Sequence, residues 1–323
     1  MSDNEIQAAT AILRRGGLVA FPTETVYGLG ADASNPTAVA RIFAAKGRPT
    51  NHPIIVHLGS VEQLSRWAID IPPAAYALAQ SFWPGPLTLI LKRHPQVLDA
   101  VTGGQDSIGL RVPGHPVAQA LLAAFGGGIA APSANRFGRI SPTSAAHVRE
   151  ELGGAVDAIL DGGACQVGIE STILDLSGGQ ARLLRPGAIS AAAIEAVLGQ
   201  PLATASRDAP RASGTLASHY APQTPLSLVH PDDLQADIKR QTEQGARVAV
   251  LARSAAIQCS QCTWQIMPAE PADYARELYA RLRALDALQL DRILIEALPA
   301  EPGWQAVRDR LARAAHESDP REA

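Results

Sequence analysis

The stretch from residue 21 to residue 57 constrains the fold more than any other part of the sequence. It reads FPTETVYGLGADASNPTAVARIFAAKGRPTNHPIIVH. Asn35 and Pro36 favour the N-cap and the first position of a helix, and Gly47 favours the C-terminal end of one. Apolar residues that suit strands precede this helix and follow it at 53–58. We therefore expect a strand–helix–strand unit in this part of the chain.

Polar and charged side chains gather in the same stretch. They are Thr23, Glu24 and Thr25 before the helix, Lys46 and Arg48 at its end, and His57 in the second strand. Two fixed cations and a histidine in one unit suit a site for an anionic small molecule. A lysine at a helix end is also common for a simpler reason, because the helix dipole attracts it. Pro49 directly after Arg48 weakens that alternative, since proline stiffens the loop that carries the arginine.

The segment 107–112 alternates strictly between polar or small residues and apolar ones. In a strand, this period places Ser107, Gly109 and Arg111 on one face and the apolar residues on the other, towards the core. An arginine on the same strand face as a glycine and a serine suits the floor of a binding cleft, because the two small residues leave space above that face. An arginine in solvent on an edge strand fits the same pattern equally well.

Further candidate residues come from later segments. Residues 132–143 (PSANRFGRISPT) combine small polar side chains with glycine, which lets a ligand approach the backbone closely. An ordinary polar loop explains a lone SAN tripeptide at least as well. The whole distributed set is Thr23, Thr25, Lys46, Arg48, His57, Ser107, Arg111, Ser133, Asn135, Ser171 and Arg185. Without a P-loop, nucleotide chemistry needs such cations, because phosphoryl transfer depends mainly on positioning and charge stabilisation.

Length and composition favour two domains joined by a linker. The chain has 323 residues, of which 46% are apolar, so it can bury a sizeable core. Segment 201–225 is rich in proline and in small and polar residues, without an apolar period, which is typical of a linker. Strand-like and helical runs alternate after it. We expect a catalytic domain at 1–200, the linker at 201–225, and a small, largely parallel α/β domain at 226–323.

Several common classes of protein are disfavoured. The net charge of −3 argues against a nonspecific nucleic-acid coat, which is basic. The P-loop pattern G-x-x-x-x-G-K-[ST] is absent. Residues 28–33 match G-x-G-x-x-A, but the helix begins only at Asn35 and the next acidic residue after Asp32 is Glu62. A dinucleotide-binding turn is therefore disfavoured.

The cysteines and the lack of long apolar runs indicate in which cellular compartment the protein is expected. Cys165, Cys259 and Cys262 do not make a disulfide framework, and the lone CxxC lacks a second pair for zinc. We expect the two CxxC cysteines to be incidental and the compartment to be reducing. The first residues lack the features of a secretory signal, and no apolar run reaches the ~18 residues of a membrane helix. The expectation is a soluble, cytoplasmic protein without membrane contact.

Several motifs in register resemble one known family. They are PTETVYGLG, KGRP followed by PIIVH, IGLRVP, APSANRFGRISPT, ESTILDL and LLRPGAI, and the ending ASHYAP before the C-terminal domain. In this order they look like the YrdC/Sua5 family, in its long Sua5 form, over essentially the whole chain. The resemblance implies an α/β fold with a twisted, mixed sheet, outer helices and a large concave basic cleft. It also implies a small Rossmann-like α/β domain at the C-terminus.

The resemblance implies a nucleotidyltransferase reaction as well. L-threonine, bicarbonate or CO2, and ATP would give threonylcarbamoyl-adenylate and diphosphate. Mg²⁺ would accompany ATP, with no tightly bound metal site in the protein. The product is the first intermediate towards the threonylcarbamoyl group on adenosine 37 of tRNA, and a separate transferase complex would complete that modification. Weak binding of tRNA is a further implication.

Matching motif positions assign residues to the two substrates. Lys46 and Arg48 would be catalytic and would neutralise the triphosphate. The threonine contacts would be Thr25, His57, Arg111, Ser133 and Ser171. The ATP contacts would be Arg48, His52, Ser107, Asn135, Thr143, Arg185 and Tyr220, with Ser141 as the alternative to Thr143. Because Tyr220 lies on the linker, we expect the linker to fold over the cleft as a lid.

Two other functions compete with this one. A double-stranded RNA-binding module would use the family's basic cleft, although the net charge of −3 counts against it. A carbamoyltransferase-like domain of hydrogenase maturation proteins resembles the same family. Such domains accompany zinc-finger cysteines and an acylphosphatase segment, and neither is evident in this sequence.

Overall fold

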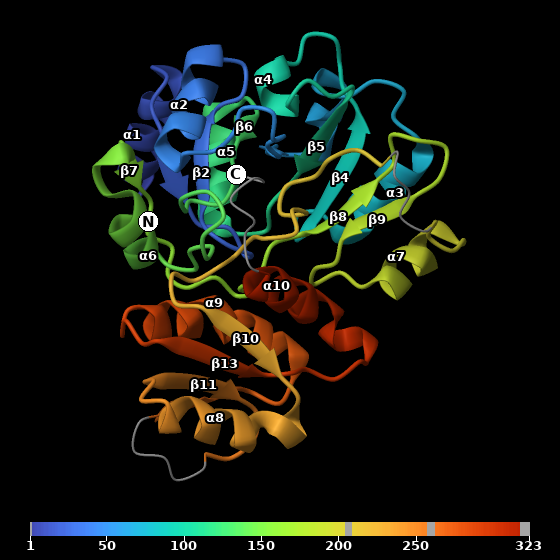
Figure 1. Ribbon diagram of the computed structural model, residues 1–323. Helices are drawn as coiled ribbons and strands as arrows, with labels where there is room; N and C mark the ends of the chain where they lie inside the picture. Colours follow the sequence, from blue (N-terminus) through green and yellow to red (C-terminus); the bar gives the residue numbers. More distant parts are fainter. Residues whose placement is uncertain (1, 204–208, 257–261, 317–323) are drawn as a thin grey trace. The chain divides into compact units, whose positions relative to one another are not determined.

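The computed structural model describes residues 2–203, 209–256 and 262–316 (Figure 1). The chain divides into two compact units. The N-terminal unit comprises residues 1–137 and 141–215, and the C-terminal unit comprises residues 138–140 and 216–323. The main division thus falls inside the segment expected to be a linker. A three-residue piece, 138–140, interrupts the sequence of the N-terminal unit and belongs to the C-terminal unit.

The N-terminal unit is built on one mixed sheet. Among the described residues, nine strands lie in the order β7-β1-β2-β6-β3-β5-β4-β8-β9. The strands are β1 (Val19–Phe21), β2 (Gly28–Asp32), β3 (Val56–His57), β4 (Leu87–Lys92), β5 (Ser107–Arg111), β6 (Ile129–Ala130), β7 (Ala158–Ile159), β8 (Thr172–Asp175) and β9 (Arg182–Arg185). β5 is parallel to β3 on one side and antiparallel to β4 on the other. The predicted mixed sheet is confirmed.

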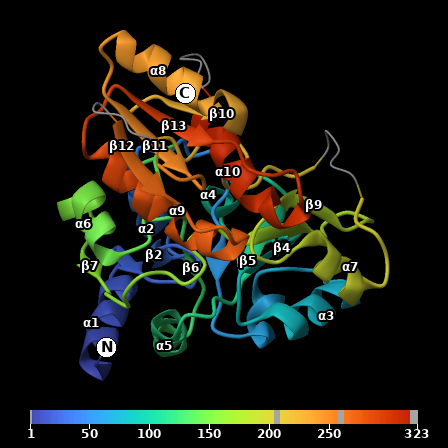
Figure 2. The same cartoon turned by 90° about the horizontal axis from the view of Figure 1, so that it is seen from below.

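Helices lie on the outside of this sheet (Figures 1 and 2). They are α1 (Asp3–Arg14), α2 (Pro36–Lys46), α3 (Pro73–Phe82), α4 (Asp99–Thr102), α5 (Pro116–Phe125), α6 (Ala145–Leu152) and α7 (Ala191–Leu198), with the 3-10 helices η1 (Val61–Arg66) and η2 (Gly153–Ala155). The buried face of α1 shares a core with β1 and with Leu121 and Leu122 of α5. Burial of such apolar faces, more than helix propensity, stabilises helices of this length.

The strand–helix–strand unit predicted for residues 21–57 is present, with shorter strands than expected. Asn35 caps α2 by accepting hydrogen bonds from the N–H groups of Thr37 and Ala38. Gly47 ends the helix in the left-handed conformation, with φ of 61°. The strand expected at 53–58 is reduced to β3. The residues between Gly47 and β3 instead form a loop, which carries side chains of the candidate site.

The glycine-containing residues 28–32 form a strand rather than a phosphate-binding turn. They make up β2, which pairs antiparallel with β1. A Cβ atom at Gly30 would lie 2.8 Å from the Phe21 ring and 2.9 Å from Ile129. The glycine therefore allows close packing inside the sheet, which agrees with the disfavoured dinucleotide interpretation.

The C-terminal unit is a smaller α/β structure. Its described residues form a parallel sheet of four strands in the order β10-β13-β11-β12. The elements are β10 (Leu226–Val229), η3 (Pro231–Asp233), α8 (Leu234–Glu243), β11 (Val248–Ala252), β12 (Cys262–Ile266), α9 (Pro271–Asp286), β13 (Arg292–Glu296), η4 (Pro302–Trp304) and α10 (Gln305–Ala315). The predicted parallel α/β domain is confirmed.

One prediction about cysteines was wrong. Cys262 is disulfide-bonded, whereas Cys165 is free and buried. The prediction rested on the missing second cysteine pair, which a zinc site needs and a disulfide does not. Cys259 lies outside the described residues.

The structure was also searched for membrane-spanning helices. Within the described ranges, no helix is both long enough and apolar enough to cross a membrane.

Candidate active site

Lys46 is the last residue of α2, and its side chain is buried in the N-terminal unit. Its Nζ donates one hydrogen bond to the Ser133 carbonyl at 2.6 Å and a second to the Asn135 carbonyl. Burial, followed by repulsion from Arg48, lowers the pKa of Lys46 well below its ordinary value. The two carbonyl acceptors favour the protonated form. The amine thus joins the end of α2 to the loop that contains Ser133 and Asn135.

Arg48 lies two residues further on and is also buried. Its Nη2 donates to the Pro53 carbonyl at 2.8 Å and lies 3.5 Å from the Ser213 hydroxyl. The guanidinium lies 5.6 Å from the Phe137 ring centroid, in cation–π range. The His52 ring meets the same Phe137 ring edge-on at 5.2 Å. Burial and the neighbouring Arg48 lower the pKa of His52.

Arg185 is the last residue of β9, and like Arg48 it contacts Ser213. Its Nε donates to the Ser171 carbonyl at 3.0 Å, and its Nη2 donates to the Ser171 hydroxyl at 3.2 Å. Its Nη1 donates to the Ser213 carbonyl at 2.8 Å. Ser213 therefore lies between Arg48 and Arg185. The acceptors named here are carbonyl and hydroxyl oxygens, and they orient the two guanidinium groups.

Arg111 is held differently, by a buried carboxylate. Its Nη2 lies 2.6 Å from Oε1 of Glu24, its Nη1 donates to the Thr25 hydroxyl at 3.0 Å, and its Nε donates to the Gly85 carbonyl at 3.1 Å. The other Glu24 oxygen accepts from the Gly114 N–H at 2.9 Å. Arg111 is 4% exposed on β5, inside the sheet, so the edge-strand alternative is wrong. The sequence placed Glu24 beside two candidate threonines but did not predict this ion pair.

His57 lies next to Arg111, because β3 and β5 pair with these two residues in register. Its ring is buried and meets Phe21 edge-on at 6.0 Å. Burial, followed by the Arg111 charge, lowers the pKa of His57 to about 3. The imidazole is therefore neutral at physiological pH. Its Nδ1 is buried and has no hydrogen-bond partner among the described residues.

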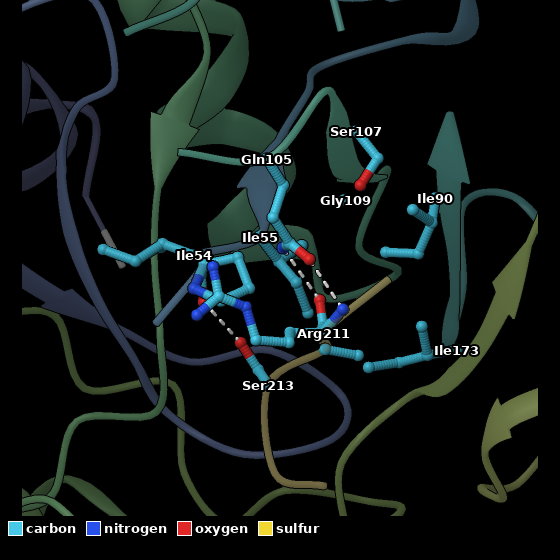
Figure 3. A pocket seen from close by; sticks show the side chains of 11 residues that line it. Ile54, Ile55, Ile90, Gln105, Ser107, Gly109, Ile173, Arg211 and Ser213 are labelled. Atoms are coloured by element: carbon cyan, nitrogen blue, oxygen red, sulfur yellow. Dashed lines mark hydrogen bonds between the residues drawn. The ribbon is translucent and has the colours of Figure 1, made fainter. Parts of the chain in front are cut away.

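A hollow that opens to solvent lies beside these cations (Figure 3). Its floor is apolar and its rim is polar; the lining residues are Pro53, Ile54, Ile55, Ile90, Gln105, Ser107, Gly109, Ile173, Arg211, Ala212 and Ser213. Ser107 and Gly109 share the β5 face that the sequence predicted to be a floor. The apolar residues of the opposite face, such as Leu110, belong to the core.

Residues 211–213 of the expected linker form one wall of this hollow. The Arg211 N–H donates to the Gln105 side chain at 2.7 Å, and the Gln105 amide donates back to the Arg211 carbonyl at 3.1 Å (Figure 3). The Ser213 hydroxyl donates to the Pro53 carbonyl at 2.8 Å, and Ala212 packs on Ile90 and Ile173. Sequence reasoning missed Gln105 and Arg211, because neither belongs to a local pattern.

Two predicted ATP contacts stand apart from these clusters. Thr143 is buried, and its described hydrogen bonds join it to His147 and, through its carbonyl, to Cys165. Its alternative, Ser141, donates to a Glu170 oxygen at 2.5 Å. Tyr220 belongs to the C-terminal unit, where it is buried. The remaining predicted residues lie in the N-terminal unit, in the linked groups described above.

Two family profiles together match almost the whole chain. The Sua5/YciO/YrdC profile, described as "Telomere recombination", matches residues 11–187. The profile "Threonylcarbamoyl-AMP synthase, C-terminal domain" matches residues 189–316. The chain belongs to the Sua5/YciO/YrdC family. Because both profiles match in this order, it has the long Sua5 form that the motifs predicted.

Similar members of the Sua5/YciO/YrdC family match over nearly their full length. A threonylcarbamoyl-AMP synthase of Pyrococcus abyssi is 40% identical over 96% of this chain and 94% of its own length. One from Bacillus subtilis is 40% identical over 97% of this chain and 94% of its own. The crystal structure of P. abyssi Sua5 complexed with L-threonine superposes with a TM-score of 0.90 at 39% identity, covering 98% of this chain and 95% of that one. The fold is therefore that of Sua5.

Proposed function

We propose that this chain is a threonylcarbamoyl-AMP synthase. It converts L-threonine, bicarbonate or CO2, and ATP into threonylcarbamoyl-adenylate and diphosphate. The observation that carries the proposal is the convergence of Lys46, Arg48 and Arg185 in a chain that matches synthases of that name from end to end. Lys46 and Arg48 lie two residues apart, and Arg185 comes from a distant part of the sequence to contact Ser213, as Arg48 does. Such a cluster suits a polyphosphate.

In the reaction an N–C bond and an O–P bond form, while an N–H bond and a P–O bond break. The threonine amine attacks CO2 and loses a proton, which gives a carbamate; bicarbonate supplies CO2 by loss of hydroxide. A carbamate oxygen then attacks the α-phosphorus of ATP, and the bond from that phosphorus to the bridging oxygen breaks, so diphosphate leaves. Negative charge builds up on the departing diphosphate. Lys46 and Arg48 stabilise this charge electrostatically, which is the main contribution that proteins make to phosphoryl chemistry.

Threonine binds, in this proposal, next to Arg111, His57 and Thr25, with Ser133 and Ser171 as further contacts. Arg111 has five N–H groups and uses three of them on Glu24, Thr25 and Gly85. Two N–H groups remain for the threonine carboxylate. A lysine would lose this paired geometry. The neutral His57 offers a nitrogen to the amine or hydroxyl of threonine without adding charge.

ATP binds, in this proposal, along the hollow and the adjoining cations. The apolar floor suits the nucleoside, Ser107 lies at its rim, and Arg48 and Arg185 lie where phosphates would follow. The other proposed contacts are His52, Asn135, Thr143 and Tyr220. Mg²⁺ would be held by ATP itself and would offset part of the phosphate charge. Within the described residues, no group of three or more His, Cys, Asp or Glu side chains could hold a metal ion.

The product leaves for a different protein. Threonylcarbamoyl-adenylate is a mixed anhydride, so its carbamoyl carbon is reactive towards nucleophiles, and the proposed acceptor is an adenosine of tRNA. We propose a separate cytoplasmic transferase complex as that consumer.

A product assay tests the proposal directly. The full chain is incubated with ATP, Mg²⁺, L-threonine and bicarbonate, and the products are identified by mass spectrometry. Threonylcarbamoyl-adenylate and diphosphate are expected only in the complete mixture. Omitting threonine or bicarbonate in turn is the control. Diphosphate release that does not depend on threonine would contradict the proposal and indicate a different acceptor.

A further inference from the structure

Thr88 on β4 is a buried polar residue to which the proposed reaction assigns no role. Its exposed fraction is 0%. Leu87 and Leu89, its neighbours along the strand, pack in the main hydrophobic core, so Thr88 points to the opposite face of the sheet. A Cβ atom at Gly109, which lines the hollow, would lie 3.6 Å from the Thr88 methyl group (Figure 3). Thr88 therefore lies on the sheet face that carries the candidate site.

The strand register places Thr88 between two of the proposed ligand-binding arginines. In the antiparallel register of β4 and β5, Thr88 comes one step after the last pair and lies beside Arg111. On its other side Thr88 pairs with Ile173 of β8, which in turn pairs with Arg185 of β9. His57 pairs with Arg111 from β3. One row across five strands thus runs from the proposed threonine contacts to a proposed ATP contact, with Thr88 at its centre.

The Thr88 hydroxyl contacts the proposed threonine site through Ser171. The two hydroxyl oxygens lie 2.8 Å apart, and within the described ranges Ser171 is the one hydrogen-bond partner of the Thr88 side chain. The Ser171 hydroxyl is buried as well, and the Arg185 Nη2 lies 3.2 Å from it. A guanidinium N–H can only donate, so the Ser171 oxygen accepts this second bond.

The direction of the hydrogen bond between the two hydroxyls decides what Ser171 can offer to a ligand. If Ser171 donated to Thr88, the Thr88 hydrogen would have no acceptor among the described residues, and a buried unpaired donor is costly. If Thr88 donates, both lone pairs of Ser171 are filled, by Thr88 and by Arg185. The Ser171 hydrogen then remains for an oxygen atom of the substrate. The bond from the charged Arg185 also polarises the Ser171 hydroxyl, which makes it a stronger donor.

We propose that Thr88 is a positioning residue for the amino-acid substrate, and that it acts through Ser171. By donating to the Ser171 oxygen, the Thr88 hydroxyl directs the Ser171 hydrogen towards an oxygen atom of threonine. The inference rests on the proposed function, and it adds a residue that orients a substrate contact without touching the substrate.

Equilibrium binding of L-threonine to the full chain, measured by calorimetry, tests the proposal. Thr88→Val replaces the hydroxyl with a methyl group of similar size, and L-threonine binding is expected to weaken about tenfold. Thr88→Ser keeps the hydroxyl and should bind within about threefold of the natural chain. Thr10→Val is the matched control: Thr10 is equally buried, and its hydroxyl has no hydrogen-bond partner among the described residues. A thermal melt of each variant checks that it is folded.

A double-mutant cycle separates action through Ser171 from a general change in packing. Ser171→Ala removes the group that Thr88 orients, so adding Thr88→Val to it should weaken L-threonine binding by less than about twofold more. In kinetics, Thr88→Val should raise the KM for threonine about tenfold, while kcat and the KM for ATP change less than about threefold. Losses that multiply in the double variant, or equal L-threonine affinity for Thr88→Val and Thr10→Val, would overturn the inference.

The product assay distinguishes failure of this inference from failure of the proposed function. If threonylcarbamoyl-adenylate forms but Thr88→Val binds L-threonine normally, the positioning role fails and the proposed function stands. If Thr88→Val and Ser171→Ala both weaken L-threonine binding, their combination is no worse, and no adenylate forms, the proposed function fails and the positioning role stands.

Discussion

Two sets of cationic side chains, one from each unit, are held in different ways. In the N-terminal unit, Lys46 and Arg48 are buried and donate to backbone carbonyls. In the C-terminal unit, Arg276 and Arg281 are half-exposed and pair with carboxylates one helical turn away. Burying a cation costs free energy that carbonyl hydrogen bonds only partly offset. Buried cations of this kind are therefore expected where the charge has a function. Burial with carbonyl acceptors indicates a ligand site, whereas exposure with a carboxylate partner indicates a solvated surface.

Arg111 is the informative intermediate case. It is buried like Lys46 but paired with a carboxylate like the arginines of α9. The pair with Glu24 reduces the attraction of Arg111 for an anion, but it fixes the plane of the guanidinium. Shape and hydrogen-bond direction, rather than net charge, would then select the threonine carboxylate.

The largest expected effect is on the rate of diphosphate release when the buried Lys46, rather than an exposed lysine, is replaced. Lys46→Ala should reduce diphosphate release by ~100-fold or more, because a preorganised charge at the phosphates is lost. Lys92→Ala is the control: Lys92 is exposed and pairs with Asp70, so its loss should leave the rate nearly unchanged. Both rates are measured with saturating threonine, and a thermal melt confirms folding. Turnover of Lys46→Ala at the control's rate would remove Lys46 from the mechanism.

A smaller effect concerns the buried histidine and pH. The pKa of His57 is about 3 in the folded chain and near its ordinary 6.5 when unfolded. The unfolded chain therefore binds one more proton between these values, so stability from His57 is present above about pH 6.5 and declines as pH falls. The decline is roughly 1.4 kcal/mol per pH unit down to about pH 3. Urea unfolding from pH 6.5 to 4.5 should show a shallower pH dependence for His57→Gln than for the natural chain; equal slopes would argue against a buried, neutral His57.

The smallest effect is expected on the exposed side of the comparison. Arg276→Ala removes an ion pair with Asp273 whose two side chains are 48% and 44% exposed. Solvent screens such pairs, so the free energy of unfolding should change by less than ~0.5 kcal/mol. Denaturant unfolding at low and at high salt measures it. A loss well above that size would mean that exposed pairs matter here as much as buried ones.

The sequence predicted those parts of the fold that depend on local patterns. Asn35, Pro36 and Gly47 determined the ends of α2. The period of 107–112 predicted the shared face of Ser107 and Gly109, which line the hollow, whereas Arg111, predicted on the same face, does not line it. The pairing of Glu24 with Arg111 was not predictable, because it depends on which strands become neighbours. The same holds for Ser213, which reaches both Arg48 and Arg185 through the path of an irregular segment. Long-range placement of single polar residues leaves no periodic signal.

The C-terminal unit includes residues 138–140, so it is not one continuous stretch of sequence. Recombination between relatives at residue 215 would therefore exchange only part of it. Helix α9 of one relative would then contact residues 138–140 of another relative, which evolved with a different α9. Chimeras that also exchange this tripeptide should be more active than those that do not, and homologous sequences should show the tripeptide co-varying with Arg283 of α9, which donates a hydrogen bond to the Ile140 carbonyl.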